Sequence, residues 1–201
     1  MTNSPLSLNR IFKVWLPLAA SWLLMGMEMP ILSAVVARLV DPEINLAAYG
    51  GIVFPLALII EAPVIMLLAA STALSKDWAS YKKLRNYMVL AGGLLTALHL
   101  LVALTPLYYS FAVGLLGAPV EIIEPARIGL IIMTPWTWTI AYRRLNQGVM
   151  IRFGHSNIIG IGTTVRLGMD ILVLAVGYYL KLPGIVVATS AVAAGGTAEA
   201  S

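Results

Sequence analysis

Ionisable side chains stand in the middle of apolar runs at several places in this chain. Glu28 occurs in the segment GMEMP and Glu61 in PLALIIEAPVIMLL, and a proline follows each acid two residues later, at Pro30 and Pro63. An acid in an apolar environment holds a proton readily, binds a cation, or bonds within a helix bundle. We therefore take Glu28 and Glu61 as candidates for carrying a proton or cation. The alternative is that both acids are hydrogen-bonded and only fix the packing.

Arg166 and Asp170 are four residues apart, which places them on one face of a helix. The two side chains either neutralise each other, so that the helix inserts into a membrane, or Arg166 binds an anionic substrate group while Asp170 holds it in place. His99 lies in another apolar run. It is a candidate for contacting a substrate or relaying a proton, and the alternative is a hydrogen-bonded interior histidine.

The composition identifies the solvent around these groups as lipid. Of the 201 residues, 60% are hydrophobic and 11% charged, and the mean hydropathy is +0.90. These values indicate an integral membrane protein. The apolar runs are continuous rather than alternating, which favours helices over the strands of a β-barrel.

A bilayer core about 30 Å thick requires about 20 mostly apolar residues per helix. The sequence therefore predicts an all-α polytopic bundle that forms one transmembrane domain over residues 1–201. We expect the fourth span to extend beyond the hydrocarbon, so that Arg143 and Arg144 reach the headgroups. Six spans are expected, at 14–37, 46–74, 87–104 with an interfacial tail to 116, 128–142, 158–180 and 183 onward.

Basic residues mark one side of the membrane. Nine of the thirteen Lys and Arg residues fall before the first span or in the second and fourth connections, which predicts that these parts and the N-terminus are cytoplasmic. We expect the protein to lie in a plasma or inner membrane. The net charge of +4 reflects this topology, and we expect no nucleic acid as a partner. A cleavable signal peptide is the competing account of the first run, which is too long for one. The nine are Arg10, Lys13, Lys76, Lys82, Lys83, Arg85, Arg143, Arg144 and Arg152.

The sequence gives no support for an enzyme. It holds no phosphate-binding loop, metal-ligand cluster or Ser/His/Asp arrangement, and it has no cysteine. We expect neither a cofactor nor a metal site.

Three segments carry a resemblance to a known family. LAAYGGIVFPLALIIEAP in the second run and MTPWTWTIAYRRLNQGVMIRFGHS after the third connection resemble one lobe of a multidrug and toxic compound extrusion (MATE) transporter. AGGLLTALHLLVALTPLYY is more similar to the progressive ankylosis (ANK) branch of that superfamily. The resemblance covers nearly the whole chain.

The resemblance implies twelve helices in two lobes, related by an axis along the membrane normal, around a cavity that opens alternately to each side. Some family members bind a cation between an acid on the first helix and an Asn and Asp on the fifth. Glu28 and Asp170 match the two acids, and Arg166 stands in the Asn place. Its fixed charge competes with Na⁺, which favours an anionic substrate or a structural ion pair.

The function implied by the resemblance is secondary active transport, as an exporter or antiporter, of an organic anion or drug-like solute coupled to H⁺ or Na⁺. One lobe cannot enclose the cavity, so we expect a second lobe in a longer protein, with the last helix cut at AVAAGGTAEAS, or a second copy of the chain. A flippase for a lipid-linked sugar or phospholipid is the alternative within transport. A membrane assembly subunit without transport activity is the alternative from another class.

Overall fold

The computed structural model describes residues 8–201, and these form a protein of helices without a β-strand. The expected cytoplasmic N-terminus concerns residues 1–7, which lie outside the described residues. Four described segments are long and apolar enough to cross a bilayer, so the protein is membrane-embedded. They are Leu18–Val36, Pro42–Leu74, Trp78–Leu104 and Ser156–Tyr179.

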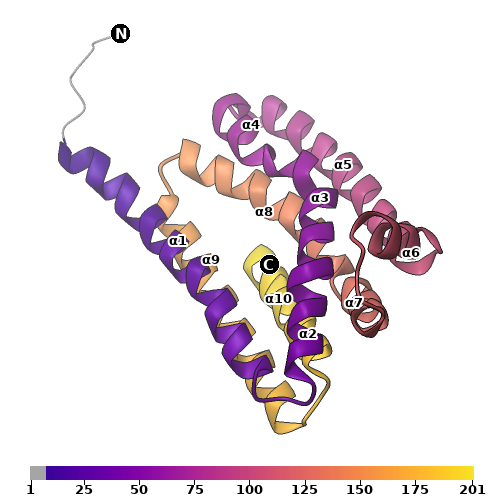
Figure 1. The fold of residues 1–201 in the computed structure, drawn as a ribbon. Coiled ribbons are helices and arrows are strands. Elements are labelled where there is room, and N and C mark those ends of the chain that lie inside the picture. Colours follow the sequence, from indigo (N-terminus) through magenta and orange to yellow (C-terminus); the bar gives the residue numbers. More distant parts are fainter. Residues whose placement is uncertain (1–7) are drawn as a thin grey trace, which may run out of the picture.

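The first apolar segment is a single helix, α1 (Leu8–Val36), which continues through Pro30 without a break. It packs along α9 (Ser156–Tyr179) over much of its length (Figure 1). This contact brings Glu28 of α1 beside Arg166 of α9, although 138 positions separate them in the sequence.

The second apolar segment is a helix with two irregular places. It runs through α2 (Pro42–Ala48), a π-helical stretch (Tyr49–Val53), α3 (Phe54–Ile65) and α4 (Leu67–Leu74). Pro63 lacks the N–H that would bond to the carbonyl of residue 59, and the helix breaks three residues later at Met66. Glu61 lies on the buried face of α3, 1% exposed.

The next part of the chain contains one long helix and several short ones. Asp77 caps the start of α5 (Trp78–Leu104), and α6 (Leu107–Tyr109) and a π-helical stretch (Ser110–Leu115) follow. The predicted fourth span, 128–142, is divided at Met133 between α7 (Val120–Ile132) and α8 (Thr134–Arg152). Pro135, in the first turn of α8, has no N–H to continue the hydrogen bonding of α7.

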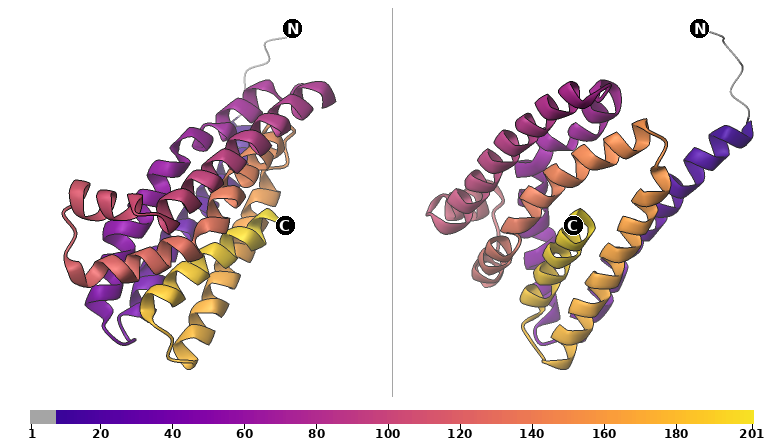
Figure 2. Two further views of the ribbon diagram at one scale, coloured as in Figure 1. Left: turned by 90° about the vertical axis from the view of Figure 1, so that its right-hand side faces the viewer. Right: turned by 180° about the vertical axis from the view of Figure 1, so that it is seen from behind.

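The helices form two arms that diverge from one end of the molecule. One arm is α1 with α9, and the other contains α3, α4, α5, α7 and α8 (Figures 1 and 2). The arms meet near the connections 37–41 and 180–183. The last helix, α10 (Gly184–Ala200), packs against α8 and α9 and ends in the opening between the arms (Figure 2). Residues near its end therefore meet side chains from both arms.

Candidate functional site

Arg166 of α9 binds Glu28 of α1. Its Nη2 atom donates to both carboxylate oxygens of Glu28, at 2.7 and 2.6 Å, and the two side chains are only 5% and 11% exposed. Asp170, one turn along α9, is more distant, with 3.9 Å between its Oδ2 and Arg166 Nε. The closest acid to Arg166 is thus on another helix, because α1 packs along α9.

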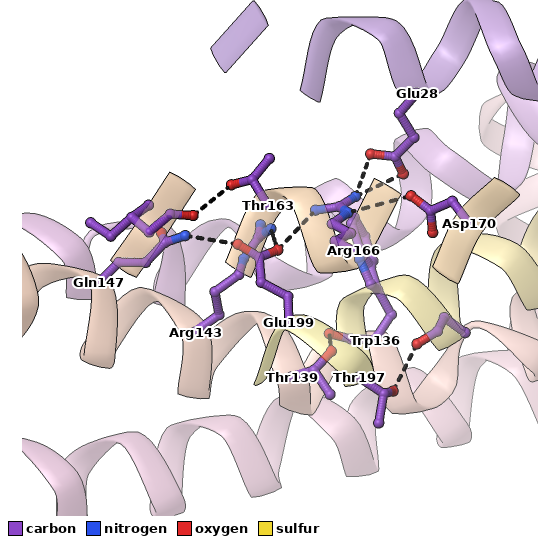
Figure 3. A network of polar contacts seen from close by, with 12 residues as sticks. Glu28, Trp136, Thr139, Arg143, Gln147, Thr163, Arg166, Asp170, Thr197 and Glu199 are labelled. Atoms are coloured by element: carbon purple, nitrogen blue, oxygen red, sulfur yellow. Dashed lines mark hydrogen bonds and ion pairs between the residues drawn. The ribbon is translucent and has the colours of Figure 1, made fainter. Parts of the chain in front are cut away.

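Glu199, near the end of α10, lies between two arginines (Figure 3). Its Oε2 is 2.6 Å from Nη1 of Arg143 and 3.7 Å from Nη1 of Arg166. Its Oε1 accepts a hydrogen bond of 3.1 Å from Nε2 of Gln147. Glu28, Arg166, Glu199 and Arg143 therefore alternate in charge across α1, α9, α10 and α8.

The expectation that Arg143 reaches the headgroups is wrong. Arg143 is 5% exposed, and its guanidinium points into the bundle toward Glu199. The reason is the close approach of α10: a Cβ at Gly196 would lie 2.7 Å from the Trp136 ring of α8, so only glycine fits there. Arg144, the next residue, is half-buried.

Asp170 is the third carboxyl of this network, and it lies beside Arg166. It is 2% exposed, and within residues 8–201 no group donates a hydrogen bond to either of its carboxylate oxygens. Its Oδ1 packs directly against Gly195 of α10, where a Cβ would collide with it. Glu28, Asp170 and Glu199 together carry one more negative charge than Arg143 and Arg166 balance, and a proton or a monovalent cation would neutralise this excess.

Two cavities adjoin the network, and Arg143 lines both. The larger, about 500 Å³, lies between α8, α9 and the end of α10, and Gln147 and Glu199 are among its polar lining residues. The smaller, about 180 Å³, lies between α1, α3, α8 and α9. Its charged lining consists of Glu28, Glu61, Arg143, Arg144 and Arg166.

Glu61 and His99 form a second polar group, on either side of Thr137 of α8. Nδ1 of His99 is 2.7 Å from the Thr137 hydroxyl, and Nε2 is 2.8 Å from the carbonyl oxygen of Leu130. The same hydroxyl lies 3.5 Å from Oε1 of Glu61. All of these side chains are at most 1% exposed.

The candidates from the sequence thus fall into two groups that meet at the smaller cavity. Glu28, Arg166 and Asp170 lie together, and Glu61 lies with His99; Glu28, Arg166 and Glu61 all line the smaller cavity. The sequence reasoning missed Gln147, Thr137 and the pairing of Arg143 with Glu199. One signal was present: Arg143 and Gln147 are four residues apart, which places both on one face of a helix.

The chain matches no known family model, no curated protein and no solved structure. Within the described residues, no group of three or more His, Cys, Asp or Glu side chains is arranged to hold a metal ion. The fold and site define a membrane-embedded helical protein with charged side chains buried between two arms of helices.

Proposed function

We propose that the chain is a six-helix lobe of a secondary active transporter of the MATE type, in a plasma or inner membrane. In this proposal α7 with α8 forms the fourth span and α10 the sixth, in addition to the four long apolar segments. The main support is the buried network of Arg143, Arg166, Glu28, Asp170 and Glu199 beside a cavity of about 500 Å³.

The energetic cost of this network favours a function over packing alone. Moving ionised groups out of water costs several kcal/mol per ion, and well-packed apolar side chains often stabilise a protein as well as a buried ion pair does. Charged side chains inside membrane segments accordingly mark substrate or ion pathways in many proteins. Here Glu199, Arg143 and Arg166 lie in the opening between the two arms (Figure 2), where a movement of the arms would change their contacts.

The charged residues of the network are divided between the two arms, and Glu199 connects them. Glu28, Arg166 and Asp170 belong to the arm of α1 and α9, whereas Arg143 belongs to the other arm, and Glu199 contacts an arginine of each. An anionic substrate group would replace Glu199 on Arg143, because a guanidinium binds carboxylate and phosphate groups in the same geometry. A cavity of this volume is within the range of about 300–1,000 Å³ that drug-sized ligands occupy.

In this proposal the carboxyl of Asp170 binds the coupling ion. Asp170 takes up H⁺ or Na⁺ when the cavity opens to one side and releases it at the other, since no described residue donates a hydrogen bond to its buried carboxylate. A second lobe, or a second copy of the chain, closes the cavity from the open side of the arms. The transported solute is an organic anion or a drug-like molecule with an anionic group.

Alternating access is tested with single cysteines, because residues 1–201 contain none; any cysteine outside them is first replaced by serine. Ile161 lines the larger cavity and is 63% exposed, and Tyr179, at the end of α9, is 89% exposed. The full-length protein carrying Ile161→Cys or Tyr179→Cys is treated with a membrane-impermeant maleimide in right-side-out and in inverted vesicles. We expect Ile161→Cys to react in both preparations and Tyr179→Cys in one only.

Reaction of Ile161→Cys from a single side would contradict alternating access. That result, together with unchanged labelling over a range of pH and Na⁺ concentrations, would favour the assembly subunit, whose buried charges pair with another protein. The flippase would be favoured if Ile161→Cys is labelled from both sides, long-chain phospholipid blocks this labelling, and small organic anions leave it unchanged.

A further inference from the structure

His99 is fully buried, and one of its ring nitrogens has a defined proton. Its Nε2 faces the backbone carbonyl of Leu130 at 2.8 Å. This carbonyl belongs to the last turn of α7, where helix carbonyls lack the next turn's N–H groups as partners. Because a carbonyl oxygen only accepts hydrogen bonds, Nε2 must carry a hydrogen.

The other ring nitrogen faces a group that both donates and accepts. Nδ1 of His99 is 2.7 Å from the Thr137 hydroxyl, which has one hydrogen to donate. On the far side of that hydroxyl, Oε1 of Glu61 lies at 3.5 Å. Thr137 therefore joins a base on α5 to an acid on α3, and its hydrogen points to whichever of the two lacks a proton.

We propose that Glu61, Thr137 and His99 form a proton-binding site that holds one proton in common. In one form the Glu61 carboxyl donates to the Thr137 oxygen, and the Thr137 hydroxyl donates to Nδ1. In the other form Nδ1–H donates to the Thr137 oxygen, and the hydroxyl donates to the Glu61 carboxylate. All three side chains keep their places, and Nε2 donates to Leu130 in both forms.

The conversion between the forms is balanced within the three residues. The Glu61 O–H bond breaks as a new O–H bond forms on Thr137, while the original Thr137 O–H bond breaks and an N–H bond forms at Nδ1. The net change is the transfer of one proton from Glu61 to His99, and no water or other reactant takes part. The contact between Thr137 and Glu61, at 3.5 Å, is longer than an ordinary O–H···O hydrogen bond, so the transfer requires this contact to shorten.

The transfer changes the charge of the smaller cavity without proton uptake from water. The charged groups that face Glu61 there are Glu28 of α1, Arg143 and Arg144 of α8, and Arg166 of α9. When Glu61 becomes a carboxylate, its proton is held on His99, which is not among the residues lining that cavity. Within the proposed function this site would hold a second proton, apart from the ion that Asp170 takes up. The inference itself rests on the contacts, and its test requires no transport.

The test measures the ratio of imidazolium to neutral His99 from ¹⁵N NMR of histidine-labelled full-length protein in lipid nanodiscs. The His99 signals are identified by their loss in His99→Gln. We expect Glu61→Gln to lower the ratio about tenfold at a given pH, since the carboxylate partner of the imidazolium is lost. In a Thr137→Val background, the same Glu61→Gln change should alter the ratio less than about threefold.

Two further variants distinguish the role of the Thr137 hydroxyl from a general effect on packing. Thr137→Ser retains a hydroxyl and should keep the tenfold effect of Glu61→Gln. Thr96→Val removes a hydroxyl from α5 that donates to the carbonyl of Gly92 in the same helix, and should also leave the effect intact. The proposal is overturned if Glu61→Gln has the same effect with and without the Thr137 hydroxyl, or if His99 stays neutral in wild-type protein at every pH at which it is folded.

Discussion

The carboxylate of Glu199 lies 2.6 Å from Nη1 of Arg143, and the two side chains are only 3% and 4% exposed. The pair joins α10 to α8 in the middle of the bundle. Each charge is out of water, so neither residue has an alternative source of solvation if the other is removed. Their contributions to stability are therefore expected to depend strongly on each other.

Removing one member of this pair should destabilise the protein more than removing both. We expect Glu199→Gln or Arg143→Gln alone to lower the free energy of unfolding by about 3 kcal/mol, because an unpaired charge stays buried. The double variant should lose less than either single variant. Denaturant unfolding in micelles measures these values, and Lys83→Gln, an exposed site, serves as the control with little change expected. Additive losses would show that the pair is not a unit.

Asp170 should tolerate loss of its charge better than Glu28. Glu28 accepts two hydrogen bonds from Arg166, whereas no described residue donates one to Asp170. We expect Glu28→Gln to cost about 3 kcal/mol of unfolding free energy, and Asp170→Asn to change it by less than about 1 kcal/mol. Asparagine also removes the excess negative charge. The same unfolding assay measures both, and an equal loss in the two variants would mean that Asp170 is a full partner of Arg166.

Much of this fold, but only part of the site, could be predicted from the sequence. Long apolar runs are sufficient to predict membrane helices, since every backbone group in lipid must bond within its own helix. The spacing of Arg166 and Asp170 correctly placed them on one face. That α1 packs along α9, and so gives Arg166 a closer acid than Asp170, depends on tertiary packing over 138 positions of sequence.

The surroundings of Arg143 also could not be predicted from the local sequence. Two adjacent arginines after TWTIAY are typical of a helix end at the headgroups, and local sequence offers nothing against that interpretation. Only the position of α10, close against α8 through small residues, places a carboxylate beside Arg143. Thr137 carried no signal at all, because a hydroxyl within a helix commonly bonds to its own backbone.

Gly148 should be a position where even one methyl group is not accepted. It lies where α8 meets α4, and a Cβ there would collide with the Ser71 side chain and the Leu68 backbone carbonyl. We expect Gly148→Ala to lower the free energy of unfolding by about 2 kcal/mol or more. Gly168→Ala, on α9 with nothing within 4 Å of the added Cβ, is the matched control. It should be neutral or stabilise by up to about 1 kcal/mol, because alanine favours helix. Equal effects at the two sites would refute the close contact.

The start of α5 should depend on pH through Asp77, which lies in the connection outside the apolar segments. Its Oδ1 accepts hydrogen bonds of 2.7 Å from the Ser80 amide and from the Ser80 hydroxyl. Together these contacts lower the pKa of the Asp77 carboxyl below its ordinary value. The ionised cap therefore stabilises the helix start fully at pH values above the unfolded-state pKa of about 3.9. The stabilisation is lost as the pH falls through the lower pKa of the folded state.

Hydrogen exchange at the Ser80 amide provides a local measurement of this cap. Protection relative to the intrinsic exchange rate should fall in acid for the wild type. It should be pH-independent in Asp77→Asn, because asparagine caps a helix almost as well as aspartate and does not titrate. Asp77→Ala should show low protection at every pH, since it has no side-chain acceptor. A wild-type amide whose protection stays constant down to acid pH would mean that the carboxylate does not hold the end of α5.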